Sequence, residues 1–414
     1  MSCLAASLVF VRVCERLTVG RLCRQAAGAA VRSLRLGALF VCVGSSALSA
    51  PLEARLNEQV IMIPVAANDA SYALETTLFK PPGAGPFPLL LLNHGKAVGD
   101  PRSQARDRFL AVSQLFVSRG YAVAIPMRRG FARSGGTYRE FDCDMAANGQ
   151  LQADDIQAAL HYLQAQPWVD RDRVVVAGQS YGGLATLALG TRHLAGVRGL
   201  INFAGGLRLY GSDCAWQSSL VAAFHDYGKH TTIPSIWFYG RNDHHFSPAL
   251  ARQLYRAYAG SGVQAKLVAF GSYRNDAHGM GASWGGVKIW WPDTEKFLRA
   301  IGMPTRRTVM LAAPSKMPDT HFAPLEDVAA LPYLDDCGRA AYRQFLQQPL
   351  PRAFAVSSSG AWSWAEDGDD PQEKALADCE KANGAPCRLY ATDNSVVWTG
   401  EPQQLAAAAR PGNS

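Results

Sequence analysis

Short apolar runs alternate with longer amphipathic stretches along the middle of the chain. Each apolar run is rich in Val, Ile, Leu or Phe, has the length of one strand and ends at Gly, Pro or a polar residue, which is typical of buried strands. The stretches between them repeat apolar residues at helical spacing. This alternation predicts an α/β fold in which helices cover both faces of a mostly parallel sheet. The predicted strands are 87–92, 120–126, 174–176, 197–203, 236–240 and 266–270, and the predicted helices are 103–119, 150–166, 184–189 and 248–259.

Different patterns flank this central region. Two β-branched runs, 59–65 and 71–79, predict antiparallel strands that lead into the sheet. Beyond Pro304 the pattern is irregular and predicts a small β-α-β unit: a helix over 331–346, a strand interrupted within 354–364, a helix over 370–381 and strand residues within 387–398. The chain is therefore divided into an N-terminal signal (1–50), an α/β catalytic domain (51–303), a small α+β accessory module (304–405) and a disordered tail (406–414).

The first fifty residues have the order of a secretion signal. Six arginines stand before Leu36 against the single acid Glu15, and an apolar run over 36–44 is followed by small residues over 45–50. A basic region, a short apolar region and a small-residue cleavage zone are typical of a secretory signal, and the apolar run is shorter than the roughly 18 residues of a membrane span. We expect cleavage within 47–50 and export to the periplasm or the exterior. A disordered arginine-rich tail with a buried helix is the alternative.

The charge is concentrated in this N-terminal segment. The formal net charge of the chain is +7, and the remainder of the sequence is close to neutral with scattered Lys and Arg. Nucleic-acid binding usually needs a basic patch or stripe. We therefore expect no nucleic-acid partner, and no stable membrane span once the signal is removed.

The cysteines fit an exported protein. Four of the nine precede residue 51, which leaves five in a compartment where disulfides form. Cys379 and Cys387 are close enough in sequence to suggest one disulfide, and Cys143 with Cys214 is a weaker pairing that leaves Cys337 over. The spacings match no zinc pattern, and we expect neither a metal nor an organic cofactor.

A serine lies at a strand–turn–helix junction. The predicted strand 174–176 runs into Gly178-Gln179-Ser180-Tyr181-Gly182, and small apolar residues suited to a packed helix follow. Glycines on both sides let strand and helix approach closely and expose the serine at the turn. We predict that Ser180 is a nucleophile. The alternative is a glycine-rich turn with an ordinary surface serine.

An acid and a base follow later strands in the order that such a serine requires. Asp243 comes directly after the strand 236–240, and His278 lies in the loop after the strand 266–270. The carboxyl ends of parallel strands meet at one edge of a sheet, where function gathers. A serine nucleophile needs a base to accept its proton and an acid to orient that base. We predict the triad Ser180, Asp243 and His278.

Other residues compete for these roles. His244 and His245 lie beside Asp243 but follow the wrong strand to act as the base. Asp276 is an alternative orienting acid, although it is very near His278 in sequence. His94 is interpreted as a histidine of the core or loop that only shapes the site.

Backbone donors for the oxyanion are expected at two places. One is the N–H of Tyr181, the residue after the nucleophile, and the other lies in the loop after the strand 87–92. In His94-Gly95-Lys96 we select the N–H of Lys96, with Gly95 as the alternative. The Lys96 side chain is expected to be an ordinary loop charge.

With these motifs, residues 59–302 resemble the α/β-hydrolase fold. Within it they resemble dienelactone hydrolase-like and prolyl-oligopeptidase-like serine hydrolases. The resemblance rests on Asn93-His94-Gly95, Gly178-Gln179-Ser180-Tyr181-Gly182-Gly183, Asn242-Asp243, His278-Gly279 and the loop 129–136, which is similar to one in X-prolyl peptidases and cocaine esterase relatives. Dienelactone hydrolases often carry a cysteine nucleophile, so Ser180 at that position does not imply lactone cleavage.

The residues and the resemblance together predict an exported serine hydrolase that cleaves carboxylic esters through an acyl-enzyme. A peptidase of the prolyl-oligopeptidase or X-prolyl type is one alternative, and a non-catalytic binding protein on a hydrolase scaffold is another. The expected partner is a small ester or a short peptide. The insertion at 206–233 is predicted to be either a small aromatic lid or an ordinary surface helix.

Overall fold

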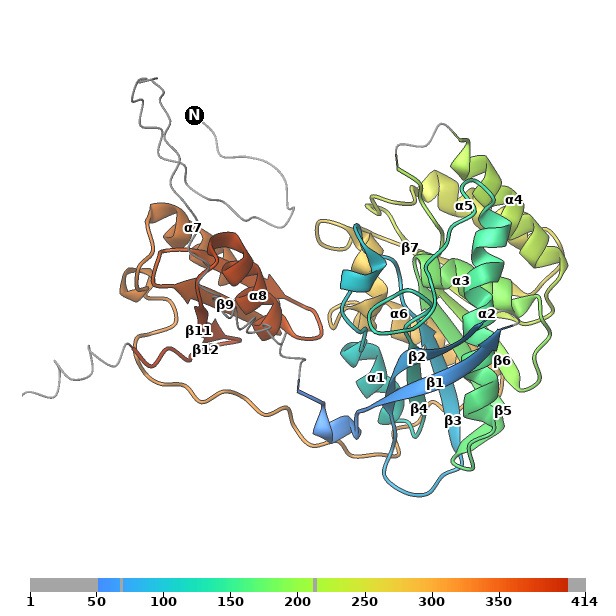
Figure 1. Cartoon of the computed structure of the whole chain (residues 1–414), viewed down its shortest axis with the longest axis horizontal. Coiled ribbons are helices and arrows are strands. Elements are labelled where there is room, and N and C mark those ends of the chain that lie inside the picture. The colour runs from blue at the N-terminus through green and yellow to red at the C-terminus, as the bar shows by residue number, and fades with distance from the viewer. Residues whose placement is uncertain (1–50, 68–69, 211–213, 401–414) are drawn as a thin grey trace, which may run out of the picture.

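The computed structural model describes residues 51–67, 70–210 and 214–400 (Figure 1), and the structural statements below concern these residues. Eight of the described strands form a large sheet in the order β1-β2-β4-β3-β5-β6-β7-β8. β2 pairs antiparallel with β1 and with β4, and every other neighbouring pair is parallel. The strands are β1 (Gln59–Ala67), β2 (Ala70–Phe79), β3 (Phe87–Asn93), β4 (Ala122–Pro126), β5 (Val169–Gln179), β6 (Val197–Phe203), β7 (Ser235–Gly240) and β8 (Ala265–Phe270).

Helices cover both faces of this sheet. Successive residues of a strand point to opposite faces, and in β3 Leu89 and Leu91 join one apolar cluster while Leu90 and Leu92 join the other. The first cluster includes residues of four helices, α2 (Met145–Gln164), α3 (Tyr181–Gly190), α4 (Trp216–Lys229) and α5 (Pro248–Ala259). The second includes residues of α1 (Leu110–Val117) and α6 (Val287–Ala300). The predicted α/β architecture is therefore confirmed.

Most predicted elements lie where the pattern placed them. β6 and α5 have the predicted bounds, and β5 extends the predicted strand 174–176 in both directions. α2 begins at Met145 rather than at residue 150, because the Asp144 side chain accepts a hydrogen bond from Ala147 N–H (2.9 Å) and caps the helix there.

The helix predicted over 103–119 is wrong in its first half, since α1 begins only at Leu110. Phe109 has a φ of 45°, which an α-helix does not accommodate. The preceding residues make long-range contacts instead: Thr77 Oγ1 donates to the carbonyl of Asp107 (2.7 Å), and Arg108 pairs with Glu58. Before Leu110 the apolar residues at helical spacing therefore do not form the predicted helix, and this segment contacts other parts of the fold instead.

The insertion at 206–233 contains α4, which packs into the core. Leu220, Ala223, Phe224 and Tyr227 are buried, and the Tyr227 hydroxyl donates to the carbonyl of Ala146 in α2 (2.7 Å). The opposite face of α4 is exposed at Gln217, His225 and Lys229, so α4 has the form of the ordinary surface helix that was one of the two predictions.

A separate small unit follows the large one (Figure 1). Its four described strands form an antiparallel sheet in the order β10-β9-β11-β12. The interruption predicted within 354–364 is the hairpin turn between β9 and β10. The elements are α7 (Asp336–Phe345), β9 (Arg352–Ser357), β10 (Trp362–Glu366), α8 (Pro371–Asn383), β11 (Cys387–Thr392) and β12 (Ser395–Val396).

Two disulfides are present in the described chain. One joins Cys379 in α8 to Cys387 in β11, and the other joins Cys143 to Cys214 across 71 residues. The first closes a short loop in the small unit, and the second ties the start of α2 to the segment before α4. Cys337 is exposed in α7.

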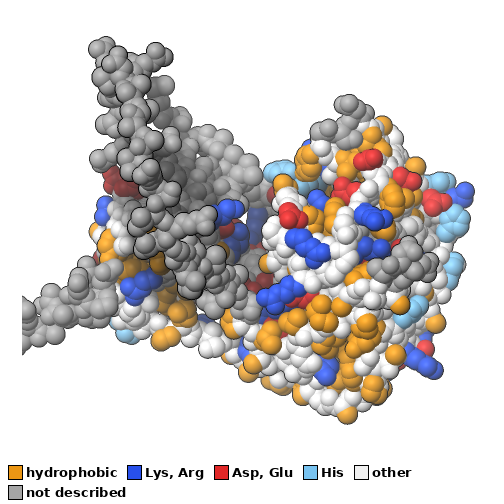
Figure 2. Space-filling model, viewed as in Figure 1, with side chains coloured by type: hydrophobic (Ala, Val, Ile, Leu, Met, Phe, Trp, Pro, Cys, Tyr) orange, Lys and Arg blue, Asp and Glu red, His pale blue; other side chains and the backbone are white. Residues whose placement is uncertain are grey.

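The predicted secretion signal (1–50) and the predicted disordered tail (406–414) lie outside the described residues. Among the helices that are described, none combines the length and apolarity that a bilayer span requires. On the face seen in Figure 2, acidic and basic side chains of the large unit are interspersed.

Candidate active site

Ser180 occupies a strained turn between β5 and α3. Its φ of 54° and ψ of −122° fall outside the regions that non-glycine residues favour. The turn is held by a hydrogen bond from Ser180 N–H to the carbonyl of Phe203 (2.9 Å). A Cβ on Gly178 would lie 2.1 Å from the carbonyl oxygen of Gly182, so the two glycines permit the close approach that the sequence suggested.

The turn lies against the loop after β3. A Cβ on Gly182 would lie 2.2 Å from the Asn93 carbonyl oxygen, and one on Gly95 would lie 3.3 Å from Ser180 Cβ. The Gly95–Lys96 backbone therefore borders the serine. Tyr181 is the first residue of α3, where N–H groups have no partner within the helix. Both predicted oxyanion donors, Tyr181 N–H and Lys96 N–H, thus belong to segments that meet at Ser180.

Asp243 and His278 form a hydrogen-bonded pair. His278 Nδ1 lies 3.1 Å from Asp243 Oδ2, and Asp243 Oδ1 accepts hydrogen bonds from the N–H groups of His245 (2.8 Å) and Phe246 (2.9 Å). Burial alone would raise the pKa of Asp243, but the bonds from His278 and from the two backbone N–H groups outweigh it and hold the pKa below its usual value. The acid is therefore kept ionised beside the imidazole.

The backbone of His278 is attached to the serine turn and to a neighbouring acid. Gln179, the residue before Ser180, donates from Nε2 to the carbonyl of His278 (3.1 Å). Asp276 Oδ1 accepts from the N–H of His278 (2.9 Å) at the start of a 3₁₀ turn, Ala277–Ala282. Within the described chain the Ser180 hydroxyl and the His278 ring do not hydrogen-bond, and such bonds are often long before substrate binds. Sequence reasoning did not identify Gln179.

The competing residues have other positions. His244 is largely exposed, with Nδ1 3.5 Å from Asp276 Oδ2. The ring of His245 lies against that of His278, with centroids 4.2 Å apart, and the Tyr210 hydroxyl is 3.0 Å from His245 Nδ1. Asp276 contacts the backbone of His278, whereas Asp243 contacts its ring. The geometry therefore favours Asp243 over Asp276 as the orienting group.

His94 is a buried link between two loops. Its Nε2 accepts a hydrogen bond from Arg128 N–H (3.0 Å), which leaves Nδ1–H to donate to the carbonyl of Gly95 (2.6 Å). Burial and the nearby Arg128 guanidinium lower the pKa of His94 well below its usual value, so the ring is neutral. His94 thus fixes the Gly95–Lys96 backbone to the loop after β4, in agreement with a role in shaping the site.

Arginines fasten the loop that follows β4. The Arg129 guanidinium donates to both oxygens of the buried Asp155 in α2. Arg128 is fully buried, and its Nε donates to Gln152 Oε1 (2.7 Å). Lys96 Nζ lies 5.5 Å from the centre of the Tyr138 ring, which holds the lysine over this loop.

The comparison with known families agrees with this geometry. Residues 108–203, a stretch that contains α1, the Ser180 turn and β6, match the model of the prolyl oligopeptidase family. Over this stretch the chain is similar to serine hydrolases of the prolyl oligopeptidase family, and its mostly parallel sheet has the predicted α/β-hydrolase fold. The matched stretch ends before Asp243 and His278, so it does not bear on the roles predicted for these two residues.

The chain is also similar to individual proteins. It is 33% identical over 111 residues to the quorum-quenching protein AidA of Acinetobacter baumannii, a match that covers 27% of this chain and spans a third of the length of that relative. An acylaminoacyl peptidase in complex with a chloromethyl ketone is 17% identical, covering 63% of this chain and 43% of its own, with a TM-score of 0.44. An esterase of Pyrococcus furiosus is 15% identical, covering 61% and 99%, with a TM-score of 0.44.

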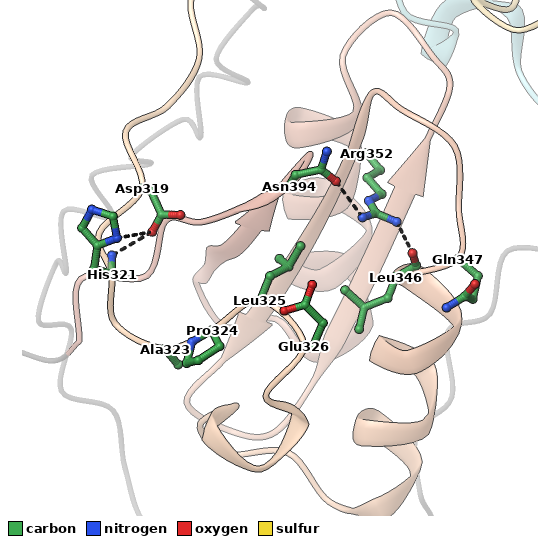
Figure 3. Close-up of a pocket in the computed structure, with 10 residues that line it drawn as sticks. All are labelled: Asp319, His321, Ala323, Pro324, Leu325, Glu326, Leu346, Gln347, Arg352 and Asn394. Carbon is green, nitrogen blue, oxygen red and sulfur yellow. Dashed lines mark hydrogen bonds and ion pairs between the residues drawn. The ribbon is translucent and has the colours of Figure 1, made fainter.

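A large cavity lies away from these residues, in the small unit (Figure 3). It has a volume of about 690 Å³, is lined by both polar and apolar residues, and has no member of the predicted triad in its lining. The guanidinium of Arg352 at its wall already donates to the carbonyls of Phe345, Leu346 and Gln348 and to Asn394 Oδ1. Its charged group is therefore engaged in holding the fold.

Proposed function

We propose that the chain is an exported serine hydrolase that cleaves carboxylic esters through a covalent acyl-enzyme. The observation that carries this proposal is the Asp243–His278 pair, whose histidine is attached through Gln179 to the strained turn that presents Ser180. A serine in this conformation, together with a histidine base and an ionised orienting acid, has the arrangement that acyl transfer requires.

In the proposed reaction the Ser180 hydroxyl oxygen attacks the ester carbonyl carbon while His278 accepts the hydroxyl proton. Asp243 stabilises the resulting imidazolium through Nδ1. The negative charge that forms on the carbonyl oxygen is stabilised by the N–H groups of Tyr181 and Lys96. When the tetrahedral intermediate collapses, the alkoxide leaves with the proton from His278. Water then attacks the acyl-enzyme by the same steps, and the acid product and free Ser180 are released.

A peptidase is the second candidate. The specific observation in its favour is the match of residues 108–203 to the prolyl oligopeptidase family. The same groups would act on an amide, with His278 delivering the proton to the leaving amine. An ester is easier to cleave because alkoxide departure demands less assistance, and on that ground we place esters first.

Export is part of the proposal. It is supported by the signal-like order of residues 1–50 and by the two disulfides, which persist mainly in oxidising compartments. Fractionation of cells that express the full chain, with N-terminal sequencing of the mature protein, tests this point. Recovery of unprocessed chain from the cytoplasm alone would contradict it.

A fluorophosphonate probe tests the catalytic proposal. We expect stoichiometric labelling of folded protein at Ser180, identified by peptide mass spectrometry, and no labelling of Ser180→Ala. A panel of p-nitrophenyl esters set against aminoacyl-proline amides then separates esterase from peptidase. Absence of labelling in the folded protein would reject the mechanism and favour a binding protein on a hydrolase scaffold.

A further inference from the structure

A loop of the small unit is inserted into the large unit, which contains the eight-stranded sheet. This docking loop, residues 367–370, connects β10 to α8. The Asp367 side chain is only 1% exposed, although it lies in a connecting loop. Buried carboxylates are costly unless their oxygens are paired. The partners of Asp367 therefore reveal what the loop does.

Four donors surround this carboxylate, and all come from the large unit. Asp367 Oδ1 accepts from the N–H groups of Trp284 (2.8 Å) and Gly285 (3.3 Å). Asp367 Oδ2 accepts from the Tyr273 hydroxyl (3.0 Å) and lies 2.7 Å from Arg274 Nη2. An ionised carboxylate offers about four acceptor positions, so its capacity is used.

These donors lie on both sides of His278 in the sequence. Tyr273 and Arg274 precede the predicted base, and Trp284 and Gly285 follow it, so one carboxylate joins the two ends of the segment that carries the histidine. The Tyr273 hydroxyl also lies 2.8 Å from Ser283 Oγ, which adds a direct link between the two ends. Without Asp367, two backbone N–H groups and a guanidinium would lose their common acceptor.

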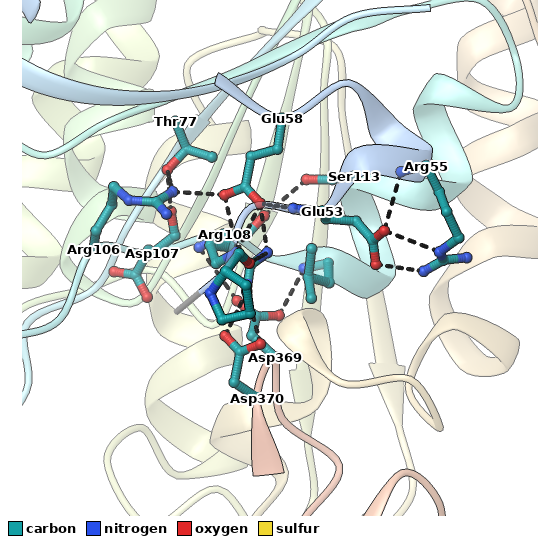
Figure 4. Close-up of polar contacts among 12 residues, drawn as sticks. Glu53, Arg55, Glu58, Thr77, Arg106, Asp107, Arg108, Ser113, Asp369 and Asp370 are labelled. Carbon is teal, nitrogen blue, oxygen red and sulfur yellow. Dashed lines mark hydrogen bonds and ion pairs between the residues drawn. The ribbon is translucent and has the colours of Figure 1, made fainter. Parts of the chain in front are cut away.

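A second set of contacts fixes the docking loop at a different place (Figure 4). Asp369 accepts from the N–H groups of Leu110 (2.6 Å) and Arg108 (3.2 Å), and Asp370 binds the Arg108 guanidinium with both oxygens at 2.7 Å. Arg108 in turn pairs with the buried Glu58. These contacts hold the small unit in place but do not touch the His278 segment, so attachment and positioning involve different residues.

We infer that Asp367 is a positioning residue for the catalytic base, supplied by the small unit. The small unit is then part of the hydrolase machinery rather than an independent accessory module. Asp367 does not contact the reacting atoms; it acts by holding the segment from Tyr273 to Gly285, and so the imidazole of His278, in register with Ser180 and Asp243. The inference rests on the proposed function, because it assigns His278 the role of base.

The test compares Asp367→Asn with Asp370→Asn in the full chain. Asparagine keeps the shape of the side chain but places an amide NH₂ where two donors need an acceptor. We expect Asp367→Asn to lower kcat for an activated ester and the rate of fluorophosphonate labelling by about 10- to 100-fold, as a misplacement of about 1 Å does. KM should change less than about threefold, and the midpoint of the pH–rate profile should shift. Asp370→Asn, which weakens attachment alone, should retain the wild-type profile.

A second measurement separates this inference from the proposed function. The side-chain NMR signals of His278, recorded in a Ser180→Ala background, report the position of the imidazole whether or not the protein is a hydrolase. They should change with Asp367→Asn and remain in place with Asp370→Asn. If wild type is not labelled at Ser180, the proposed function fails while the positioning is still measured.

Folding is controlled by near-UV circular dichroism and thermal unfolding. Should Asp367→Asn fail to fold, Tyr273→Phe removes a single donor to Asp367 and should give a smaller loss in the same direction. Equal kinetics, pH profiles and His278 signals for the Asp367 and Asp370 variants would overturn the inference and reduce Asp367 to a docking contact.

Discussion

The carboxylate of Asp243 holds the His278 ring through one oxygen and the backbone of its own loop through the other. Oδ2 lies 3.1 Å from His278 Nδ1, and Oδ1 accepts from the N–H groups of His245 and Phe246. The acid is thus fixed before it orients the base. An ionised acceptor at this position also selects the histidine tautomer that has Nε2 available to accept a proton.

Asp243→Asn should therefore inactivate the protein while leaving it folded. An amide at this position donates to, or accepts poorly from, His278 Nδ1 and favours the wrong tautomer. We expect kcat for an activated ester to fall by about three to four orders of magnitude. Steady-state kinetics measure the change. Asp276→Asn is the matched control, because Asp276 contacts His278 through the backbone N–H and not through the ring, so its loss should reduce kcat far less. Equal losses would contradict the assignment of Asp243.

The chemical groups of the site could be predicted from sequence because each follows a strand that has its own apolar pattern. Ser180, Asp243 and His278 come after β5, β7 and β8, and parallel strands bring these ends to one edge of the sheet. The strand pattern is local, so the pairing of β5 with β6 and of β7 with β8 did not have to be known.

What the sequence did not reveal depends on contacts between distant residues. The bond from Leu110 N–H to Asp369 spans 259 residues, and that from Trp284 N–H to Asp367 spans 83. Acids at the start of the predicted helix 370–381 are also the ordinary signal of a helix start, and this signal says nothing about a contact with a distant residue. Distant contacts also explain why α1 is shorter than predicted. Arg108 bonds to Glu58 and Asp370, and the chain becomes helical only after Phe109.

The close approach of α3 to the loop after β3 leads to a stability prediction. In Gly182→Ala the new Cβ would lie 2.2 Å from the Asn93 carbonyl oxygen and 2.5 Å from that of His94, which forces backbone to move. We expect the free energy of unfolding to fall by about 1–3 kcal/mol and activity to fall with it, because the moving backbone carries the predicted oxyanion donor of Lys96. Urea unfolding and ester kinetics check both effects.

Gly271→Ala provides the control for this substitution. A Cβ on Gly271 meets nothing within 4 Å, so the same change of residue type should leave stability and activity close to wild type. An equal loss in both variants would show that glycine flexibility matters here and that the tight contact does not.

The buried pair of Glu58 and Arg108 predicts sensitivity to acid. Burial would raise the pKa of Glu58, but bonds from Arg108, the Glu53 N–H and Arg106 outweigh it and lower the pKa. A carboxyl with a lowered folded pKa stabilises the fold above its unfolded pKa, near 4.5, and this contribution is lost as the pH falls through the folded value. Glu58→Gln should cost about 3 kcal/mol at pH 7 because it leaves Arg108 buried with a weaker partner.

The dependence of stability on pH in the acid range distinguishes this effect from a general loss of packing. Between pH 5 and pH 3 the stability of Glu58→Gln should fall less steeply than that of wild type, as measured by urea unfolding at each pH. Parallel curves for the two proteins would show that Glu58 does not titrate in this window.

Asp107 and Asp369 predict the opposite pH dependence at the contact between the two units. Burial, and then the charge of Asp369, raise the pKa of Asp107 to about 7; burial also raises the pKa of Asp369 to about 6. A carboxyl with a raised folded pKa stabilises the fold below its unfolded pKa, near 3.8, and that contribution is lost as the pH rises through the folded value. Stability should therefore decline between about pH 4 and pH 7 as these groups ionise.

Asp107→Asn removes one charge of this pair and keeps an acceptor for the Gln104 Nε2–H bond, which is 3.0 Å long. The Asp107 side chain is 32% exposed, so water screens part of the repulsion and the effect on Tm should be about 2 °C. We expect the variant to have a higher Tm than wild type at pH 8 and the same Tm at pH 4. The difference in Tm between pH 4 and pH 8 should therefore be smaller in the variant. Asp226→Asn, at a side chain that is 55% exposed on α4, should leave the Tm unchanged at both pH 4 and pH 8. The prediction would be contradicted if the Tm difference between pH 4 and pH 8 were the same in Asp107→Asn as in wild type. The two carboxylates would then ionise without repelling one another, and the attachment of the docking loop would not depend on pH in this range.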